Sequence, residues 1–290
     1  MPYPLPALGA PLRVAFLGPV PAVAAHALHA PAGALRPRFI DARAGAEPLS
    51  LRAALADAAP HVVVALAPET LPPGALDDVR AATLAVIGPG ARLPDRAAFD
   101  RILRTPGAGD GGAWRSRPLP IDDGLFAPVR PSRRPPRALF VGRSTERREH
   151  VLTPAKHAYD VVHYAHGLAG RRFAAVLAAA DVGIALNAES GVGFPAQALA
   201  HLAAGQLLLA EPLTPRCGLE PGIDFIEIDS RDALTTLLFQ LGLRPDAYDR
   251  VRVRGRLKAE EHRASRVWPR IVRDLLDDLS AFGTARTLKA

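Results

Sequence analysis

The stretch that decides the fold is Asp181-Val-Gly-Ile-Ala-Leu-Asn187, which continues as Ala188-Glu-Ser-Gly-Val-Gly-Phe-Pro195. Its first half is an apolar run of strand length, and its second half is a glycine-rich turn. A helical stretch follows from Pro195 to Ala204, and proline is favoured in the first turn of a helix. A strand, a glycine-rich turn and a helix in this order predict one unit of a parallel α/β sheet.

The same alternation of strands and helices runs through the chain on both sides of this stretch. The predicted strands cover residues 12–17, 39–41, 61–66, 83–87, 138–143, 161–164, 182–186, 207–210 and 225–228. The predicted helices cover residues 20–30, 49–58, 74–82, 147–156, 171–180, 195–204, 232–241 and 248–279. Strands that alternate with helices imply right-handed crossovers in a parallel sheet.

The strand and helix pattern weakens between residues 106 and 136. This zone ends in the Pro- and Arg-rich run from Pro128 to Pro136, a composition typical of a stiff, extended connector. We therefore expect an α/β protein of two Rossmann-like lobes that face a cleft. The expected domains are an abbreviated N-terminal lobe (1–128), a linker (129–137) and a C-terminal lobe with a closing helix (138–290).

Composition excludes several classes of protein. The 290 residues are 49% hydrophobic and 22% charged, which argues against global disorder. No apolar run reaches the roughly 18–20 residues that span a bilayer, and the N-terminus lacks the basic and apolar regions of a secretory signal. A single Cys217 allows no internal disulfide and no thiolate zinc cluster. These features predict a cytoplasmic protein.

The basic balance of the chain favours anionic partners. Lys and Arg total 36 against 29 for Asp and Glu, a formal net charge of +7, although the Arg, Ala and Pro content is also typical of a GC-rich bacterial genome. The densest basic run, Arg250 to Lys258, contains no aromatic residue that could stack on bases, so we expect no nucleic-acid partner. We interpret this run as a solvated helix start, with peripheral contact at the inner face of the membrane as the alternative.

The glycine-rich turn has the chemistry of a sugar-phosphate site. Gly191 and Gly193 allow the backbone to approach a ligand closely, and the helix start at Pro195 offers unpaired N–H groups that suit phosphate. Glu189 can accept hydrogen bonds from sugar hydroxyls. The alternative for these residues is an ordinary tight turn.

Arginines follow the predicted strand that ends at Gly142. The forked donors of Arg143 and Arg148 match phosphate oxygens. For Arg147, neither a functional role nor a place on a solvated helix face is favoured. His166 follows the next strand and could stack on a nucleotide base or serve as a polar loop residue. No metal site is expected, because the nine His are scattered and Asp122-Asp123 lacks an Asp-x-Asp arrangement.

Residues 118–280 resemble the nucleotide-sugar-binding domain of GT-B glycosyltransferases, in particular the bacterial "glycosyl transferases group 1" families. The resemblance rests on four pieces in the expected order: Phe140–Arg143, Asp181–Pro195 with Leu202–Gly205, Leu219–Asp224, and the helix from Arg254 to Arg270. It implies a donor diphosphate held by basic residues and a sugar held by the glutamate and glycine turn.

The chain departs from the family pattern inside the predicted helix over 195–204. The family has a second glutamate that holds the nucleotide ribose, and Ala200 occupies that place, with Gln197 and His201 nearby. His201 could replace the glutamate as a hydroxyl ligand, or it could be a residue of the helix face. The missing carboxylate leaves open a non-catalytic GT-B-like module that binds a nucleotide or a partner protein.

The resemblance implies transfer of a sugar from a UDP- or GDP-sugar to a glycan, lipid or small-molecule acceptor, without metal or other cofactor and with retention of configuration. The expected catalytic residues are Glu189, Arg143 and Arg148. The expected donor-binding residues are Gly142, His166, Gly191, Val192, Gly193, Phe194, Pro195 and His201.

Overall fold

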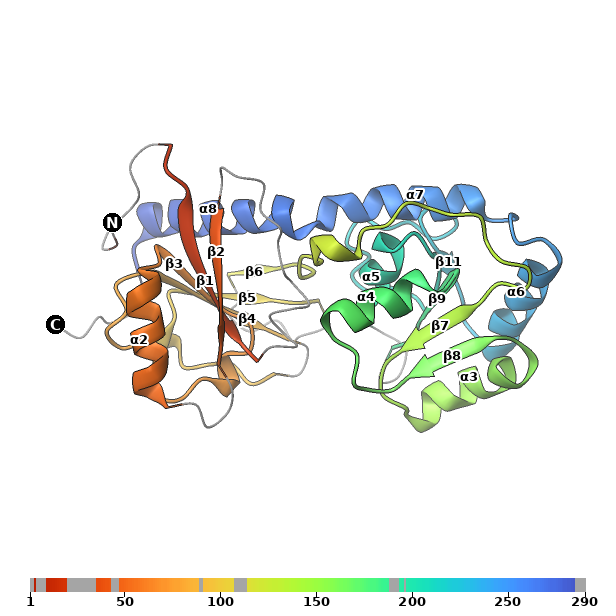
Figure 1. The fold of residues 1–290 in the computed structure, drawn as a ribbon, viewed down its shortest axis with the longest axis horizontal. Coiled ribbons are helices and arrows are strands. Elements are labelled where there is room, and N and C mark those ends of the chain that lie inside the picture. The colour runs from red at the N-terminus through yellow and green to blue at the C-terminus, as the bar shows by residue number, and fades with distance from the viewer. Residues whose placement is uncertain are drawn as a thin grey trace. The chain divides into compact units, whose positions relative to one another are not determined.

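The computed structural model describes residues 3, 9–19, 35–42, 47–88, 91–106, 114–187, 193–195 and 197–284. The chain divides into two compact units (Figure 1). Unit 1 combines residues 1–122 with residues 264–290, and unit 2 consists of residues 123–263. The predicted helix over 20–30 lies outside the described residues.

Unit 1 contains a parallel sheet with the strand order β2-β1-β3-β4-β5-β6. Its strands are β1 (Leu12–Gly18), β2 (Leu35–Asp41), β3 (Val62–Ala65), β4 (Ala82–Ile87), β5 (Arg101–Arg104) and β6 (Arg115–Ser116). Every residue of β3 and β4 is buried, as expected for strands whose two faces are both covered.

Helices cover both faces of this sheet. α8 (Ala264–Phe282) packs on one face, where the ring of Trp268 meets Phe16 edge-on with ring centroids 5.0 Å apart. α2 (Pro48–Ala58) packs on the other face, which carries Leu17, the next residue of the same strand. Unit 1 is therefore a three-layer α/β unit.

Unit 2 contains a second parallel sheet with the order β11-β10-β9-β7-β8. Its strands are β7 (Ala138–Val141), β8 (Val161–Tyr164), β9 (Val182–Ala185), β10 (Leu207–Ala210) and β11 (Ile226–Glu227). Its helices are α3 (Glu146–Ala158), α4 (Gly170–Ala178), α5 (Gln197–Ala203), α6 (Arg231–Leu243) and α7 (Asp249–Ala259). α3 and α6 pack on the sheet face that Val182 and Ile184 of β9 share.

α5 packs between the other face of this sheet and α7, and two glycines permit the close approach. A Cβ atom on Gly183 of β9 would lie 2.4 Å from the ring of His201 in α5. A Cβ atom on Gly255 of α7 would lie 2.6 Å from the side chain of Leu202, also in α5. The predicted α/β class with two Rossmann-like lobes is confirmed.

The predicted domain boundaries differ from the observed units. Residues 129–137 do not link the units, because they pack along unit 2, where Arg130 and Arg134 donate to the carbonyls of Ala178 and Leu243. The chain instead passes between the units at residues 122–123 and 263–264. The closing helix belongs to unit 1, since the apolar stripe of α8 completes that unit's core.

Three local predictions also differ from the structure. Residues 73–78 form turns in place of the predicted helix over 74–82, because Gly74 follows two prolines and has a φ of 72°. The structure adds β5 and β6, which the sequence pattern does not predict, because arginines flank the two apolar residues of β5 and β6 consists of Arg115 and Ser116 alone. The predicted helix over 248–279 is two helices, α7 and α8, separated by a 3-10 turn at Glu260–His262.

Across the described residues, no helix combines the length and the apolar character that crossing a bilayer requires.

Candidate functional site

The candidate site lies at the carboxyl ends of β7, β9 and β10 in unit 2. Ligands of parallel α/β sheets bind outside this edge. Gly142 and Arg143 follow β7, Asn187 follows β9, and Glu211 follows β10. The first turn of α3 adds further arginines to the same edge, so the polar residues of three strands and one helix meet there.

Arg148 in α3 ties the ends of two strands together. Its guanidinium donates to the carbonyl oxygens of Leu186 at 2.9 Å, Asn187 at 3.2 Å and Arg143 at 2.9 Å. Its cation also lies 5.4 Å from the ring centroid of Phe140. Burial lowers the pKa of Arg148, but an arginine of this kind stays charged at neutral pH. The structure therefore gives Arg148 a positioning role toward the strand ends.

Arg147 is paired with a buried carboxylate. Its Nη1 lies 3.1 Å from Oε2 of Glu211, and its Nη2 contacts Oε1 of the same group. Glu211 is only 6% exposed and also accepts the backbone N–H of Asn187 at 2.7 Å. The pair fixes the ends of β9 and β10 relative to α3. Sequence reasoning missed Glu211, whose one signal is an acidic residue directly after a buried apolar strand.

Arg143 differs from its two neighbours. Its side chain is exposed, and no hydrogen bond or ion pair joins its guanidinium to another residue in the described part of the chain. Its backbone carbonyl accepts from Arg148, so its position at the end of β7 is fixed. Arg143 is therefore a positioned cation whose donors are available to a ligand.

A short network holds the backbone of Gly142. The ammonium of Lys156 lies 3.0 Å from Nδ1 of His163 and 2.6 Å from Oε2 of Glu149. Because an ammonium only donates, Nδ1 of His163 accepts, and its Nε2–H donates to the carbonyl of Gly142 at 2.8 Å. The hydrogen bonds from Lys156 and Ser144 lower the pKa of Glu149. The network fixes the residue that precedes Arg143.

The glycine-rich turn is described only in part. Glu189, Gly191 and Val192 lie outside the described residues. Gly193 accepts a hydrogen bond from the amide of Thr214 at 2.9 Å, and a Cβ atom there would lie 3.0 Å from Oδ1 of Asn187.

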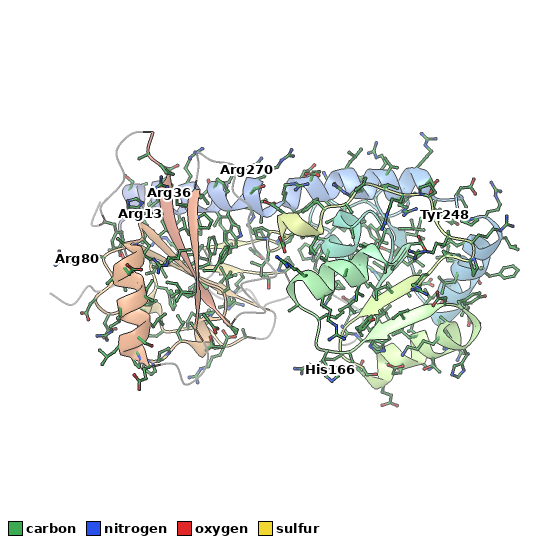
Figure 2. The ribbon with its side chains drawn as sticks, viewed as in Figure 1. Arg13, Arg36, Arg80, His166, Tyr248 and Arg270 are labelled. Atoms are coloured by element: carbon green, nitrogen blue, oxygen red, sulfur yellow. The ribbon has the colours of Figure 1, made fainter. Side chains whose placement is uncertain are left out.

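The residues after this turn differ in exposure. Phe194 is buried and Pro195 is partly buried. α5 begins at Gln197, two residues later than predicted, and spans seven residues. At the carboxyl end of β8, which pairs in parallel with β7, His166 is exposed on the loop that leads to α4 (Figure 2).

Comparisons with known proteins connect this geometry to a fold. No protein-family model and no curated protein sequence matches the chain. An α-glucosyltransferase solved with UDP-glucose and DNA containing an abasic site matches with a TM-score of 0.62 and 9% identity, over 92% of this chain and 100% of that chain. AviGT4, a glycosyltransferase involved in avilamycin A biosynthesis, matches with a TM-score of 0.56 and 14% identity, over 93% and 98%. HepE of Anabaena, solved with UDP and glucose, matches with a TM-score of 0.55 and 9% identity, over 92% and 100%. The chain has the GT-B fold.

Within this GT-B chain, His201 lies away from the candidate site. Its side chain is 0% exposed, its Nδ1 lies 2.6 Å from Oε1 of Gln206, and the ring packs against Gly183. Burial lowers the pKa of His201 to about 4, so the ring is neutral at pH 7. This burial does not support the predicted role in donor binding, and the residue is a core histidine. Ala200, in the same turn of α5, is 5% exposed.

The described residues of the GT-B chain contain no group of three or more His, Cys, Asp or Glu placed to hold a metal ion. Positive charge at the candidate edge comes from arginine side chains. Of these, Arg143 has donors left for a ligand, whereas Arg147 and Arg148 are engaged by Glu211 and by backbone carbonyls.

Proposed function

We propose that this protein is a glycosyltransferase that takes a nucleoside-diphosphate sugar as donor and binds its diphosphate at the carboxyl ends of β7 and β9. The observation that carries the proposal is the exposed guanidinium of Arg143, fixed at this edge by its own backbone and without a partner among the described residues. The GT-B fold supports it, since matching structures were solved with UDP or UDP-glucose. Forked guanidinium donors suit phosphate oxygens.

The proposed roles follow the positions of the residues. Arg143 binds the diphosphate, and Arg148 positions it through the carbonyl of Arg143 and the ends of β7 and β9. Glu189 and the glycines at 191 and 193 are assigned to the sugar, and His166 to stacking on the base. Phe194 and Pro195 support the turn.

The proposed reaction is a substitution at the anomeric carbon. The bond from this carbon to the diphosphate oxygen breaks, and its electron pair leaves with the nucleoside diphosphate. A hydroxyl oxygen of the acceptor forms the new bond, and its proton passes to the leaving diphosphate. Fixed guanidinium groups stabilise the negative charge that develops on the leaving diphosphate, so a metal is not required. Retention of configuration is part of the proposal.

A matched pair of arginine variants tests the donor site. Arg143→Ala should weaken binding of UDP-glucose by about tenfold, because a charge-assisted contact to phosphate is lost. Arg254→Ala removes the same charge from an exposed position on α7 and should change the affinity less than twofold. Isothermal titration calorimetry measures both, and equal losses would remove the diphosphate assignment.

A second candidate function is a non-catalytic GT-B module that binds a nucleotide or a partner protein. It is favoured by Ala200, which stands where the resembled family has a ribose-binding glutamate. Release of UDP from UDP-glucose, measured over a panel of hydroxyl acceptors, separates the two. Tight binding without release of UDP favours the module.

Glu189→Gln should lower the rate of transfer more than it lowers affinity for UDP.

A further inference from the structure

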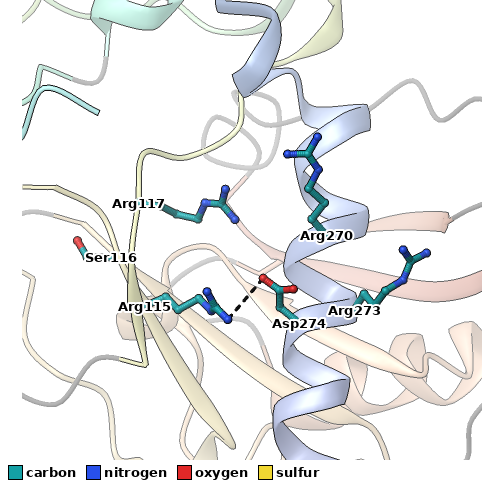
Figure 3. A pocket seen from close by; sticks show the side chains of 6 residues that line it. All are labelled: Arg115, Ser116, Arg117, Arg270, Arg273 and Asp274. Atoms are coloured by element: carbon teal, nitrogen blue, oxygen red, sulfur yellow. Dashed lines mark ion pairs between the residues drawn. The ribbon is translucent and has the colours of Figure 1, made fainter. Parts of the chain in front are cut away.

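A second basic site lies in unit 1, between the edge strand β6 and α8. A pocket of about 500 Å³ is lined by Arg115, Ser116, Arg117, Arg270, Arg273 and Asp274 (Figure 3). Four arginines and one aspartate give this lining a net charge of +3. The pocket lies next to Arg117, the residue that follows β6, and therefore at the carboxyl end of the unit 1 sheet.

Asp274 is the one carboxylate among the residues that line this pocket. Asp274 lies 3.7 Å from Nη2 of Arg115, which itself stacks 4.9 Å from the ring centroid of Trp114. No hydrogen bond or ion pair joins the guanidinium groups of Arg117 and Arg270 to the described residues. Figure 3 shows these two groups directed toward one another across the space between β6 and α8. The carboxylate therefore leaves positive charge uncompensated.

Arg117 is the informative residue of the cluster. It is partly buried, and this burial lowers its pKa; Asp274 raises the pKa, while Arg115 and Arg270 lower it. A guanidinium stays protonated at neutral pH, so the cost of its desolvation is offset by hydrogen-bond acceptors or by an anion. Other partly buried arginines of the chain have such acceptors, as Arg256 has in Glu260 and Arg101 has in Asp278.

We propose that this pocket binds the phosphate group of a small phosphorylated molecule. A phosphate monoester carries a charge of about −1.5 to −2 at pH 7 and three acceptor oxygens, which matches the converging forks of Arg117 and Arg270. The lining is polar throughout, and none of the exposed large apolar side chains of the described chain belongs to it. The phosphate can come from a soluble ester or from a lipid headgroup.

Equilibrium titration of the full chain with glucose 6-phosphate tests the proposal. We expect saturable binding that weakens as ionic strength rises, because exposed charges are screened. Arg117→Gln and Arg270→Gln should each weaken it by about tenfold or more. Arg80→Gln is the matched control, since Arg80 is an exposed arginine of unit 1 well away from Arg270 (Figure 2), and it should change the affinity less than twofold.

Two further arms identify the source of the phosphate and separate this site from the donor site. If the wild-type chain binds vesicles of phosphatidylcholine with phosphatidic acid and Arg117→Gln does not, the phosphate comes from a lipid headgroup. If the wild-type chain binds glucose 6-phosphate but not the vesicles, the phosphate comes from a soluble ester. Arg143→Ala should retain the phosphate site, and Arg117→Gln should retain binding of UDP-glucose, so failure of either site leaves the other measurable.

The proposal is overturned if glucose 6-phosphate and the vesicles both fail to bind the wild-type chain saturably. It is also overturned if Arg80→Gln weakens binding as much as Arg117→Gln does, which would show a general effect of charge. Circular dichroism of each variant checks that the fold is retained. We expect retention, because Arg117 and Arg270 are outside the apolar core of unit 1.

Discussion

Arg147 holds the buried carboxylate of Glu211 in a two-point ion pair that joins the first turn of α3 to the carboxyl end of β10. The same carboxylate accepts the amide of Asn187 at the end of β9. A single glutamate thus fixes three elements around the candidate diphosphate site. Its removal leaves the buried amide of Asn187 without its acceptor, and it leaves the partly buried cation of Arg147 with the carbonyl of Asn187 in place of a carboxylate.

Glu211→Ala should therefore lower the free energy of unfolding by about 3 kcal/mol, the scale for breaking a buried ion pair. Glu211→Gln keeps an acceptor for the amide of Asn187 and should cost less. Urea unfolding curves of the two variants measure the difference. Midpoints of both variants equal to that of the wild type would show that the pair does not organise this edge.

Two helical glycines should respond in opposite ways to alanine. A Cβ atom on Gly255 would lie 2.2 Å from the carbonyl oxygen of Asp224, so Gly255→Ala should destabilise unit 2 by roughly 2 kcal/mol or more. Gly242 in α6 has no atom within 4 Å of such a Cβ, and Gly242→Ala should stabilise by up to about 1 kcal/mol through helix propensity. Thermal unfolding of both variants gives the two signs, and a stabilised Gly255→Ala would contradict the close packing of α5 and α7.

The buried His201 should make the protein sensitive to acid. Its pKa is about 4 in the folded chain and near 6.5 when unfolded, so the unfolded state binds the proton more tightly. Stability is fully present above about pH 6.5 and falls as the pH approaches 4, by on the order of 3 kcal/mol.

The matching variant is His201→Asn, which cannot be protonated. The difference in unfolding free energy between wild type and variant, measured by urea titration from pH 7 to pH 4, should shrink as the pH falls. A difference that stays constant with pH would show that this imidazole is not the group that titrates.

The end of α2 offers a stabilising substitution. Ala59 closes this helix with φ at 40° and ψ at 55°, a left-handed conformation that costs L-residues about 1–2 kcal/mol. Ala59→Gly should raise stability by about 0.5–1 kcal/mol after the entropy of glycine is counted. Ala56→Gly, inside the same helix, should lower stability by about 1 kcal/mol. Differential scanning calorimetry measures both variants. A lower unfolding temperature for Ala59→Gly as well as for Ala56→Gly would contradict the left-handed conformation at this helix end.

Strands such as β10, whose residues are all buried, were predictable from their continuous apolar runs. β8, which is only partly buried, also has the predicted bounds, and most other elements shift by a few residues. The domain assignment of α8 could not be predicted, since its apolar stripe indicates burial but not which sheet it covers. Charged flanks hid β5, whose interior is only Ile102 and Leu103.

The candidate site was predictable in place more than in detail. The strand ending at Gly142 and the arginines after it locate the edge, because the carboxyl ends of parallel strands share one side of a sheet. The division of labour among Arg143, Arg147 and Arg148 depends on which acceptors lie nearby. Those acceptors include the carbonyls of Leu186 and Asn187, which follow β9, and the carboxylate of Glu211, all distant in sequence from these arginines.

The placement of α8 in unit 1 has a consequence for biosynthesis. The ribosome has translated the described strands of unit 1 by residue 116. The helix α8, which covers the sheet face that carries Phe16, emerges only after the whole of unit 2. Unit 2 can complete its core before α8 is translated, whereas unit 1 has to wait for α8. A nonsense codon after Arg263 would therefore damage the unit that was translated first.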